Sequence, residues 1–172
     1  MAETILITGG SGFIGIELAR SLMAEGDRVI VFDLKPPRQR TDDKSLTFVR
    51  GDITNLSQVL NVVREHRPQG IIHLAALLSE PSEGNPWDSI SINALGTYHI
   101  LEAARLFETK KLVISSSMAV YINPRSKADV VTESTPQRPP LIYGITKVFE
   151  ELLALYYHRK FGLDTRGIRL PV

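Results

Sequence analysis

The segment Ile5-Leu6-Ile7-Thr8-Gly9-Gly10-Ser11-Gly12-Phe13-Ile14-Gly15 joins a short apolar run to a cluster of glycines. Apolar residues then recur at helical spacing over residues 16–23, so the pattern predicts a strand, a glycine turn and a helix. Such a turn offers the free N–H groups of a helix N-terminus to a pyrophosphate. We expect Gly9 to make the sharp turn, Gly12 to let the backbone approach the phosphates, and Gly15 to allow close helix–strand packing. A purely structural turn is the alternative.

A carboxylate after the second expected strand favours a dinucleotide cofactor. Residues 29–32 are continuously apolar and Asp33 follows them, about twenty residues beyond the glycine turn, as the dinucleotide-binding pattern requires. A carboxylate there accepts both ribose hydroxyls of NAD and repels the 2′-phosphate of NADP, so we predict NAD. Arg38 and Arg40 lie shortly downstream and could reach a phosphate, although a solvated loop is the interpretation that we favour for them.

Size and composition favour one cytoplasmic domain, residues 1–172. The chain has 172 residues, a formal net charge of +1 and no cysteine, which excludes disulfides, thiolate metal sites and cysteine nucleophiles. Basic residues are scattered, so no nucleic-acid partner is expected. Apolar runs are too short to span a membrane, and the N-terminus leads directly into the first strand without a signal peptide, so no membrane association is expected.

Expected strands alternate with expected helices along the chain. The first strand and helix fall within residues 3–25. Further strands are predicted at 29–33, 46–49, 70–76, 111–114 and 163–170, further helices at 54–67, 87–107 and 142–161, and a polar loop at 77–86. The alternation indicates an α/β fold with a doubly wound parallel sheet, in three α/β/α layers and a single domain. Ligands of such a fold bind beyond the carboxyl ends of the strands.

Tyr143 and Lys147 lie four residues apart at the opening of a predicted helix, so their side chains share one face. A free tyrosine has a pKa of about 10, and a nearby ammonium group and a cationic nicotinamide would favour the phenolate. The hydroxyl of Ser117 could hold a substrate oxygen while Tyr143 removes its proton and a hydride leaves for NAD. The alternative is an exposed lysine beside an amphipathic tyrosine; the glycine turn and Asp33 favour a site.

This ordered set of motifs resembles the extended short-chain dehydrogenase/reductase family, also called NAD-dependent epimerases/dehydratases. The resemblance implies a Rossmann fold and an oxidoreductase that transfers a hydride between a substrate carbinol and NAD. The matching segments, in family order, are residues 8–15, Gly51-Asp52-Ile53, His73-Leu74-Ala75-Ala76, Asn93-Ala94-Leu95-Gly96-Thr97, residues 115–121 and Tyr143-Gly144-Ile145-Thr146-Lys147.

The resemblance also implies roles for single residues. Ser117, Tyr143 and Lys147 would be the catalytic set. Asn93 matches an asparagine that helps to order the site; a helix-interior amide bonded to backbone is the alternative. The implied cofactor-binding residues are Gly9, Gly12, Phe13, Ile14, Asp33, Asp52, Ile53, Leu74, Ala75, Ala76, Asn93, Ser115, Tyr143 and Lys147.

Residues 73–79 and 143–147 look most like the L-threonine 3-dehydrogenase branch of this family. On that interpretation Leu78, Ser79 and Ser117 would contact a small hydroxy amino acid as substrate. Sugar-nucleotide epimerases and uronate- or hydroxy-acid-type dehydrogenases remain alternatives, and the motifs do not separate net oxidation from epimerisation or dehydration.

Family members continue past the segment that matches residues 169–171 into a region that supplies most of the substrate pocket, whereas this sequence ends at Val172. We therefore expect either a fragment of a longer enzyme or a truncated NAD-binding module with weak or no catalysis. The family commonly dimerises through two long helices, so a homodimer through residues 87–107 and 142–161 is expected.

The histidines give no metal prediction. His66, His73, His99 and His158 lack the spacing of metal ligands. His73 precedes paired alanines on an expected buried strand, so we predict a packed, hydrogen-bonded side chain there.

Overall fold

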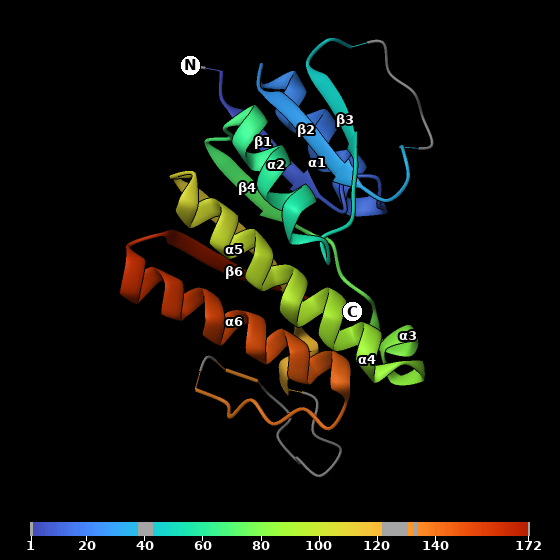
Figure 1. Ribbon diagram of the computed structural model, residues 1–172. Coiled ribbons are helices and arrows are strands. Elements are labelled where there is room, and N and C mark those ends of the chain that lie inside the picture. The colour runs from blue at the N-terminus through green and yellow to red at the C-terminus, as the bar shows by residue number, and fades with distance from the viewer. Residues whose placement is uncertain (1, 38–42, 122–130, 133, 172) are drawn as a thin grey trace.

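The computed structural model describes residues 2–37, 43–121, 131–132 and 134–171 (Figure 1). The strands are β1 (Thr4–Thr8), β2 (Arg28–Asp33), β3 (Leu46–Arg50), β4 (Gly70–His73), β5 (Lys111–Ser117) and β6 (Asp164–Leu170). The helices are α1 (Phe13–Ala24), α2 (Leu56–His66), α3 (Ser79–Gly84), α4 (Pro86–Ser89), α5 (Gly96–Leu106) and α6 (Ile142–Phe161), with a π-helical turn η1 (Ile90–Leu95) and a 3-10 turn η2 (Met118–Tyr121).

The strands form one six-stranded sheet in the order β3-β2-β1-β4-β5-β6, and every pairing is parallel. β1 lies at the centre, between β2 and β4, so the strand order changes direction beside the glycine turn that follows β1. In doubly wound sheets this switch point is where a ligand binds. The expected Rossmann-type fold is therefore confirmed.

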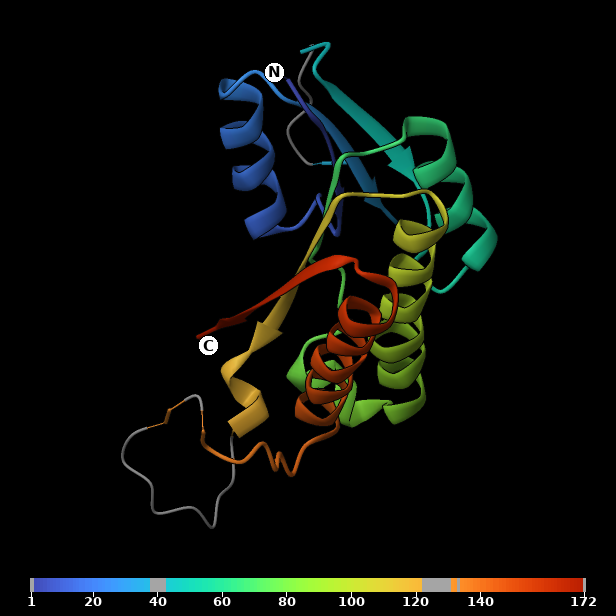
Figure 2. The same cartoon turned by 90° about the vertical axis from the view of Figure 1, so that its left-hand side faces the viewer.

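Helices cover both faces of the sheet, which gives the three expected layers. Figure 2 shows α1 on one side of the sheet and α2, α5 and α6 on the other. Alternate side chains of a strand point to opposite faces, and two apolar cores result. One core holds Ile5, Ile7, Val29 and Val31 with Ala19 of α1. The other holds Leu6, Ile30, Phe32, Ile71, Leu112 and Ile114 with residues of α2, α5 and α6.

Three segments differ from the sequence prediction. β4 ends at His73 rather than at residue 76, because the neighbouring β1 ends at Thr8 and its chain turns away. β5 instead continues to Ser117 because β6 pairs with it that far. The expected loop 77–86 contains α3, whose proline lies in the first turn, where a missing N–H costs nothing.

The predicted helix 87–107 is a continuous helical run, but its hydrogen-bond register changes at the π-turn η1. Single π-turns inside helices are frequent at functional sites. No helix in the described part of the chain combines the length and apolar character that crossing a bilayer would need.

Candidate active site

A cleft of about 1070 Å³ lies at the carboxyl ends of the strands. It brings together nearly all of the predicted site residues: Gly9, Gly12, Phe13, Ile14, Asp33, Asp52, Ile53, Leu74, Ala75, Ala76, Leu78, Ser115, Ser117, Tyr143 and Lys147 line it. Asn93 and Ser79 do not line it. A second hollow of about 810 Å³ lies between α6 and β6 and contains none of the predicted residues.

The glycine turn forms the floor of this cleft. Gly9 has a φ of +68°, and a Cβ there would lie 2.7 Å from the backbone nitrogen of Ala75. A Cβ on Gly15 would lie 2.6 Å from Cα of Gly10, so Gly15 packs against the turn itself. Gly12 is the N-cap of α1 and has no side chain to accept from the first N–H groups of the helix. These groups and the positive end of the helix dipole therefore suit a phosphate.

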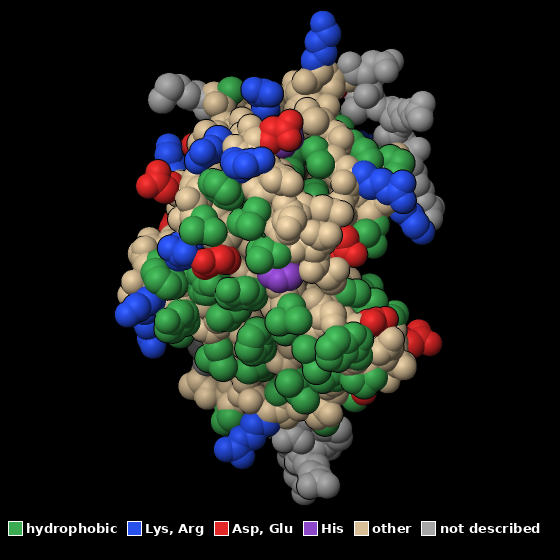
Figure 3. All heavy atoms as spheres, in the orientation of Figure 1, with side chains coloured by type: hydrophobic (Ala, Val, Ile, Leu, Met, Phe, Trp, Pro, Cys, Tyr) green, Lys and Arg blue, Asp and Glu red, His purple; other side chains and the backbone are tan. Residues whose placement is uncertain are grey.

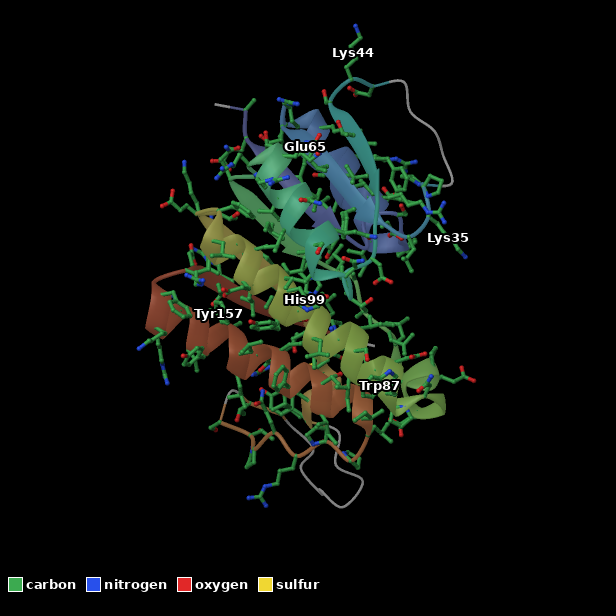
Figure 4. The ribbon with its side chains drawn as sticks, in the orientation of Figure 1. Lys35, Lys44, Glu65, Trp87, His99 and Tyr157 are labelled. Carbon is green, nitrogen blue, oxygen red and sulfur yellow. The ribbon has the colours of Figure 1, made fainter. Side chains whose placement is uncertain are left out.

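Asp33 ends β2 at the edge of the cleft. Its carboxylate accepts hydrogen bonds from the backbone N–H of Ser11 (3.1 Å) and of Lys35 (3.3 Å), which fix it beside the glycine turn. A carboxylate oxygen accepts more than one hydrogen bond, so Asp33 retains acceptor capacity for two ribose hydroxyls. Lys35 extends away from the sheet (Figure 4). Arg38 and Arg40 lie outside the described residues.

Asp52 and Ile53 form the wall on the side of α2 and α5. The Asp52 carboxylate accepts from the backbone N–H of Thr54 (2.8 Å). The carbonyl oxygen of Ile53 lies 2.8 Å from Nδ1 of His99 on α5, the side chain labelled in Figure 4. The first contact orders the loop itself, and the second ties it to α5.

His73 lies below the cleft, at the end of β4, and is 2% exposed. Its Nδ1 is 2.6 Å from the Thr8 hydroxyl oxygen and its Nε2 is 3.0 Å from the Thr97 hydroxyl oxygen. Burial, together with the positive charge of Lys147, lowers the pKa of His73 to about 3. The imidazole is therefore neutral and structural, and the prediction of a packed, hydrogen-bonded histidine is confirmed.

Asn93 lies in the π-turn behind the cleft wall and is fully buried. Its Oδ1 accepts from the N–H of Leu77 (2.7 Å), and its Nδ2 donates to the Leu77 carbonyl (3.0 Å) and to the Thr146 hydroxyl (3.1 Å). This side chain thus joins the loop after β4 to the first turns of α6. Asn93 bonds to backbone as well as to a side chain and does not line the cleft.

Ser117, Tyr143 and Lys147 come from the end of β5 and the start of α6. Their exposed fractions are 2%, 7% and 2%, and all three line the cleft. The Lys147 Nζ lies 5.7 Å from the centre of the Tyr143 ring. Ser117 Oγ accepts from the N–H of Ala119 (3.1 Å), which leaves its own hydrogen for another acceptor.

The sequence prediction missed Glu150, one turn after Lys147. Lys147 Nζ donates to Glu150 Oε2 (3.0 Å) and to the Ser115 carbonyl oxygen (2.9 Å). The spacing of three residues is one at which helix side chains meet, and this was the available signal. The ammonium beside Tyr143 is therefore partly neutralised, which weakens its effect on the phenol.

These observations fit an adenine dinucleotide. The glycine turn leaves the helix N-terminus uncovered for the diphosphate, and the Asp33 carboxylate lies where a ribose would be recognised. The protein groups that would face the reacting end, Ser117, Tyr143 and Lys147, line the same cleft.

Comparison with known proteins agrees with this geometry. The profile of the NAD dependent epimerase/dehydratase family matches residues 5–172. An uncharacterized epimerase/dehydratase of Staphylococcus saprophyticus is 36% identical over 172 residues, which cover 98% of this chain and 53% of the relative. The chain thus spans about half the length of the curated relatives that it matches.

Solved structures of two kinds are similar. The UDP-glucose 4-epimerase of Thermus thermophilus, in complex with NAD, has a TM-score of 0.86 and 32% identity over 96% of this chain and 54% of that one. The L-threonine dehydrogenase of Clostridium difficile has a TM-score of 0.88 and 35% identity over 98% of this chain and 53% of that one.

Proposed function

Because this chain belongs to the NAD-dependent epimerase/dehydratase family, we propose that it binds NAD in the cleft and supplies the groups for hydride transfer to and from a substrate carbinol. One observation supports this most directly: Ser117 on β5 and the Tyr143–Lys147 pair on α6, which are separate in sequence, line the same cleft as the glycine turn and Asp33. The structure with NAD in the similar epimerase supports the choice of cofactor.

In this proposal each residue has a separate role in cofactor binding or proton transfer. The diphosphate binds at the N-terminus of α1, and Asp33 accepts from the adenosine ribose. When bound, NAD would supply the nicotinamide ring that carries the hydride. Ser117 donates to the substrate oxygen and holds it near Tyr143, and the Tyr143 phenolate takes the hydroxyl proton. The Lys147 ammonium favours the phenolate and can bind a ribose hydroxyl.

We propose a small hydroxy amino acid or the sugar of a sugar nucleotide as substrate, because the similar solved structures include enzymes named for each. Leu78 and Ser117 line the cleft, which supports a proposed contact of each with either substrate. Ser79, the first residue of α3, does not line the cleft, so the proposed substrate contact of Ser79 has less support than that of Leu78 or Ser117.

We also propose a homodimer through α5 and α6. Figure 3 shows hydrophobic side chains gathered over these two helices. Leu95, Tyr98, Leu106, Phe149, Leu152 and Tyr156 are each at least 40% exposed. A twofold axis between the two helices would cover this face with the same face of a second copy. Leu152→Lys should then shift the molecular mass measured by light scattering from dimer to monomer.

The test of the catalytic proposal is Tyr143→Phe. We expect the rates of L-threonine oxidation by NAD and of UDP-glucose epimerisation to fall by about 100-fold or more, because the proton acceptor is lost, while NAD affinity changes little. Fluorescence of Trp87, the single tryptophan, can report NAD binding because this residue lines the cleft and is 72% exposed. Tyr156→Phe, at an exposed tyrosine on the same helix, is the control: it removes one hydroxyl but keeps the apolar ring that the proposed dimer face uses.

The results separate the alternatives. Full turnover by Tyr143→Phe would reject the catalytic assignment. NAD binding by the wild-type chain without turnover of either substrate would identify a cofactor-binding module, and no NAD binding would reject the proposal altogether.

A further inference from the structure

Glu150 is a carboxylic acid placed inside the protein, on the face of α6 that packs against the sheet. Its side chain is 1% exposed, and its Oε1 makes no hydrogen bond to any residue that the structure describes. Acidic side chains are almost never fully buried without a partner. The partner is Lys147, whose side chain is also buried and whose Nζ lies 3.0 Å from Glu150 Oε2.

The contacts of Lys147 determine what its ammonium can do. An ammonium group has three N–H donors. One donates to the Ser115 carbonyl oxygen on β5 and one to Glu150 Oε2, so at most one is left for a ligand or for Tyr143 in the cleft. A buried lysine without an opposite charge tends to lose its proton, because burial disfavours the charged form.

Among the residues that the structure describes, the groups around this pair give it no other counter-ion. On α6, Glu151 raises the pKa of Glu150 through repulsion, and it is bound to Arg169 instead. On β4, His73 is neutral, and the positive charge of Lys147 helps to keep it so. Burial raises the pKa of Glu150, and the Lys147 ammonium opposes this shift, so Lys147 is the group that favours the charged form of this carboxyl.

We propose that Glu150 is the positioning residue of this site: its carboxylate keeps the Lys147 ammonium charged and turns its remaining N–H toward the cleft. The inference rests on the proposed function only for the role of Lys147, since the ion pair itself needs no cofactor. A residue that merely fills space at this position would act through its volume, whereas Glu150 acts through its charge. The two roles can be separated by substitution.

The test compares Glu150→Gln, which keeps the size and loses the charge, with Glu150→Asp, which keeps the charge and loses a methylene. Lysine side chains of the full chain are labelled with ¹³C at Cε and titrated by NMR, and Lys147→Arg identifies the Lys147 signal. We expect Glu150→Gln to lower the pKa of Lys147 by about two units or more, because charges this close interact strongly even at high effective dielectric. Glu150→Asp keeps the negative charge, so most of this decrease in the Lys147 pKa should be absent in that variant.

Glu65→Gln, an exposed acid on α2, controls for the change in net charge. An unchanged Lys147 titration in Glu150→Gln, or a loss in Glu150→Asp alone, would overturn the proposal. Should either variant not fold, the wild-type chain decides: its Lys147 signal must shift as the neighbouring Glu150 carboxyl titrates, and a signal that does not respond to this titration overturns the inference. These readouts use neither NAD nor turnover, so their failure is distinct from failure of the proposed function.

Discussion

The neutral, buried His73 should make the stability of this protein depend on pH. Its pKa is 6.5 when unperturbed and about 3 in the folded protein, because burial and the charge of Lys147 disfavour the imidazolium. Below pH 6.5, His73 in the unfolded chain therefore binds a proton that His73 in the folded chain does not bind. The contribution of His73 to stability is complete above pH 6.5 and is lost as the pH falls toward 3.

The magnitude follows from linkage. Each pH unit below 6.5 lowers the His73 contribution to the unfolding free energy by about 1.4 kcal/mol. At about pH 4.5 this contribution is therefore lower by about 2.7 kcal/mol. Glu150 acts in the opposite sense, because its pKa is raised from 4.5 to about 7. Its contribution is complete below pH 4.5 and is lost as the pH rises through about 7. The contributions of His73 and Glu150 to the unfolding free energy change with pH in opposite directions. The pH dependence of wild-type stability therefore does not reveal either one by itself.

The assay is therefore a difference between two proteins. Urea unfolding is followed by circular dichroism for the wild type and for His73→Gln, at several values from about pH 7.5 to about pH 4.5. The unfolding free energy of the wild type minus that of His73→Gln should decrease by about 2.7 kcal/mol from about pH 7.5 to about pH 4.5. His158→Gln, an exposed histidine, provides the background for loss of a surface imidazole. If this difference in unfolding free energy stays constant with pH, or increases as the pH falls, His73 is not buried in its neutral form.

Three further predictions concern the cofactor and the core. Asp33→Ser should lower the ratio of NAD to NADP affinity by about tenfold or more, because the charge that repels a 2′-phosphate is lost; an unchanged ratio in binding titrations would contradict this role. Gly15→Ala should abolish NAD binding, since its Cβ would lie 2.6 Å from Cα of Gly10; calorimetry that finds wild-type affinity would be inconsistent with the turn. Leu101→Ala, at a position with no exposed surface, should cost about 2–5 kcal/mol in urea unfolding, and a loss below about 1 kcal/mol would show that the site is not tightly packed.

The amino-acid sequence by itself determined the order of strands and helices and the position of the cleft. Local pattern carries this information: the apolar run before Gly9, the acid Asp33 after a second run, and the four-residue spacing of Tyr143 and Lys147. Parallel strands place all of their carboxyl ends at one edge, so residues at those ends must meet.

Only the tertiary structure decided which buried groups are partners. The sequence marks Asn93 and His73 as polar residues in apolar elements, but their partners come from 16 to 65 residues away, as with Leu77 and Thr8. The charge state of Glu150 likewise depends on its burial and on the nearby Lys147, because desolvation is a property of packed surroundings and leaves no pattern in the chain. Spacing predicts which side chains can meet, and packing determines how much charge each of them holds.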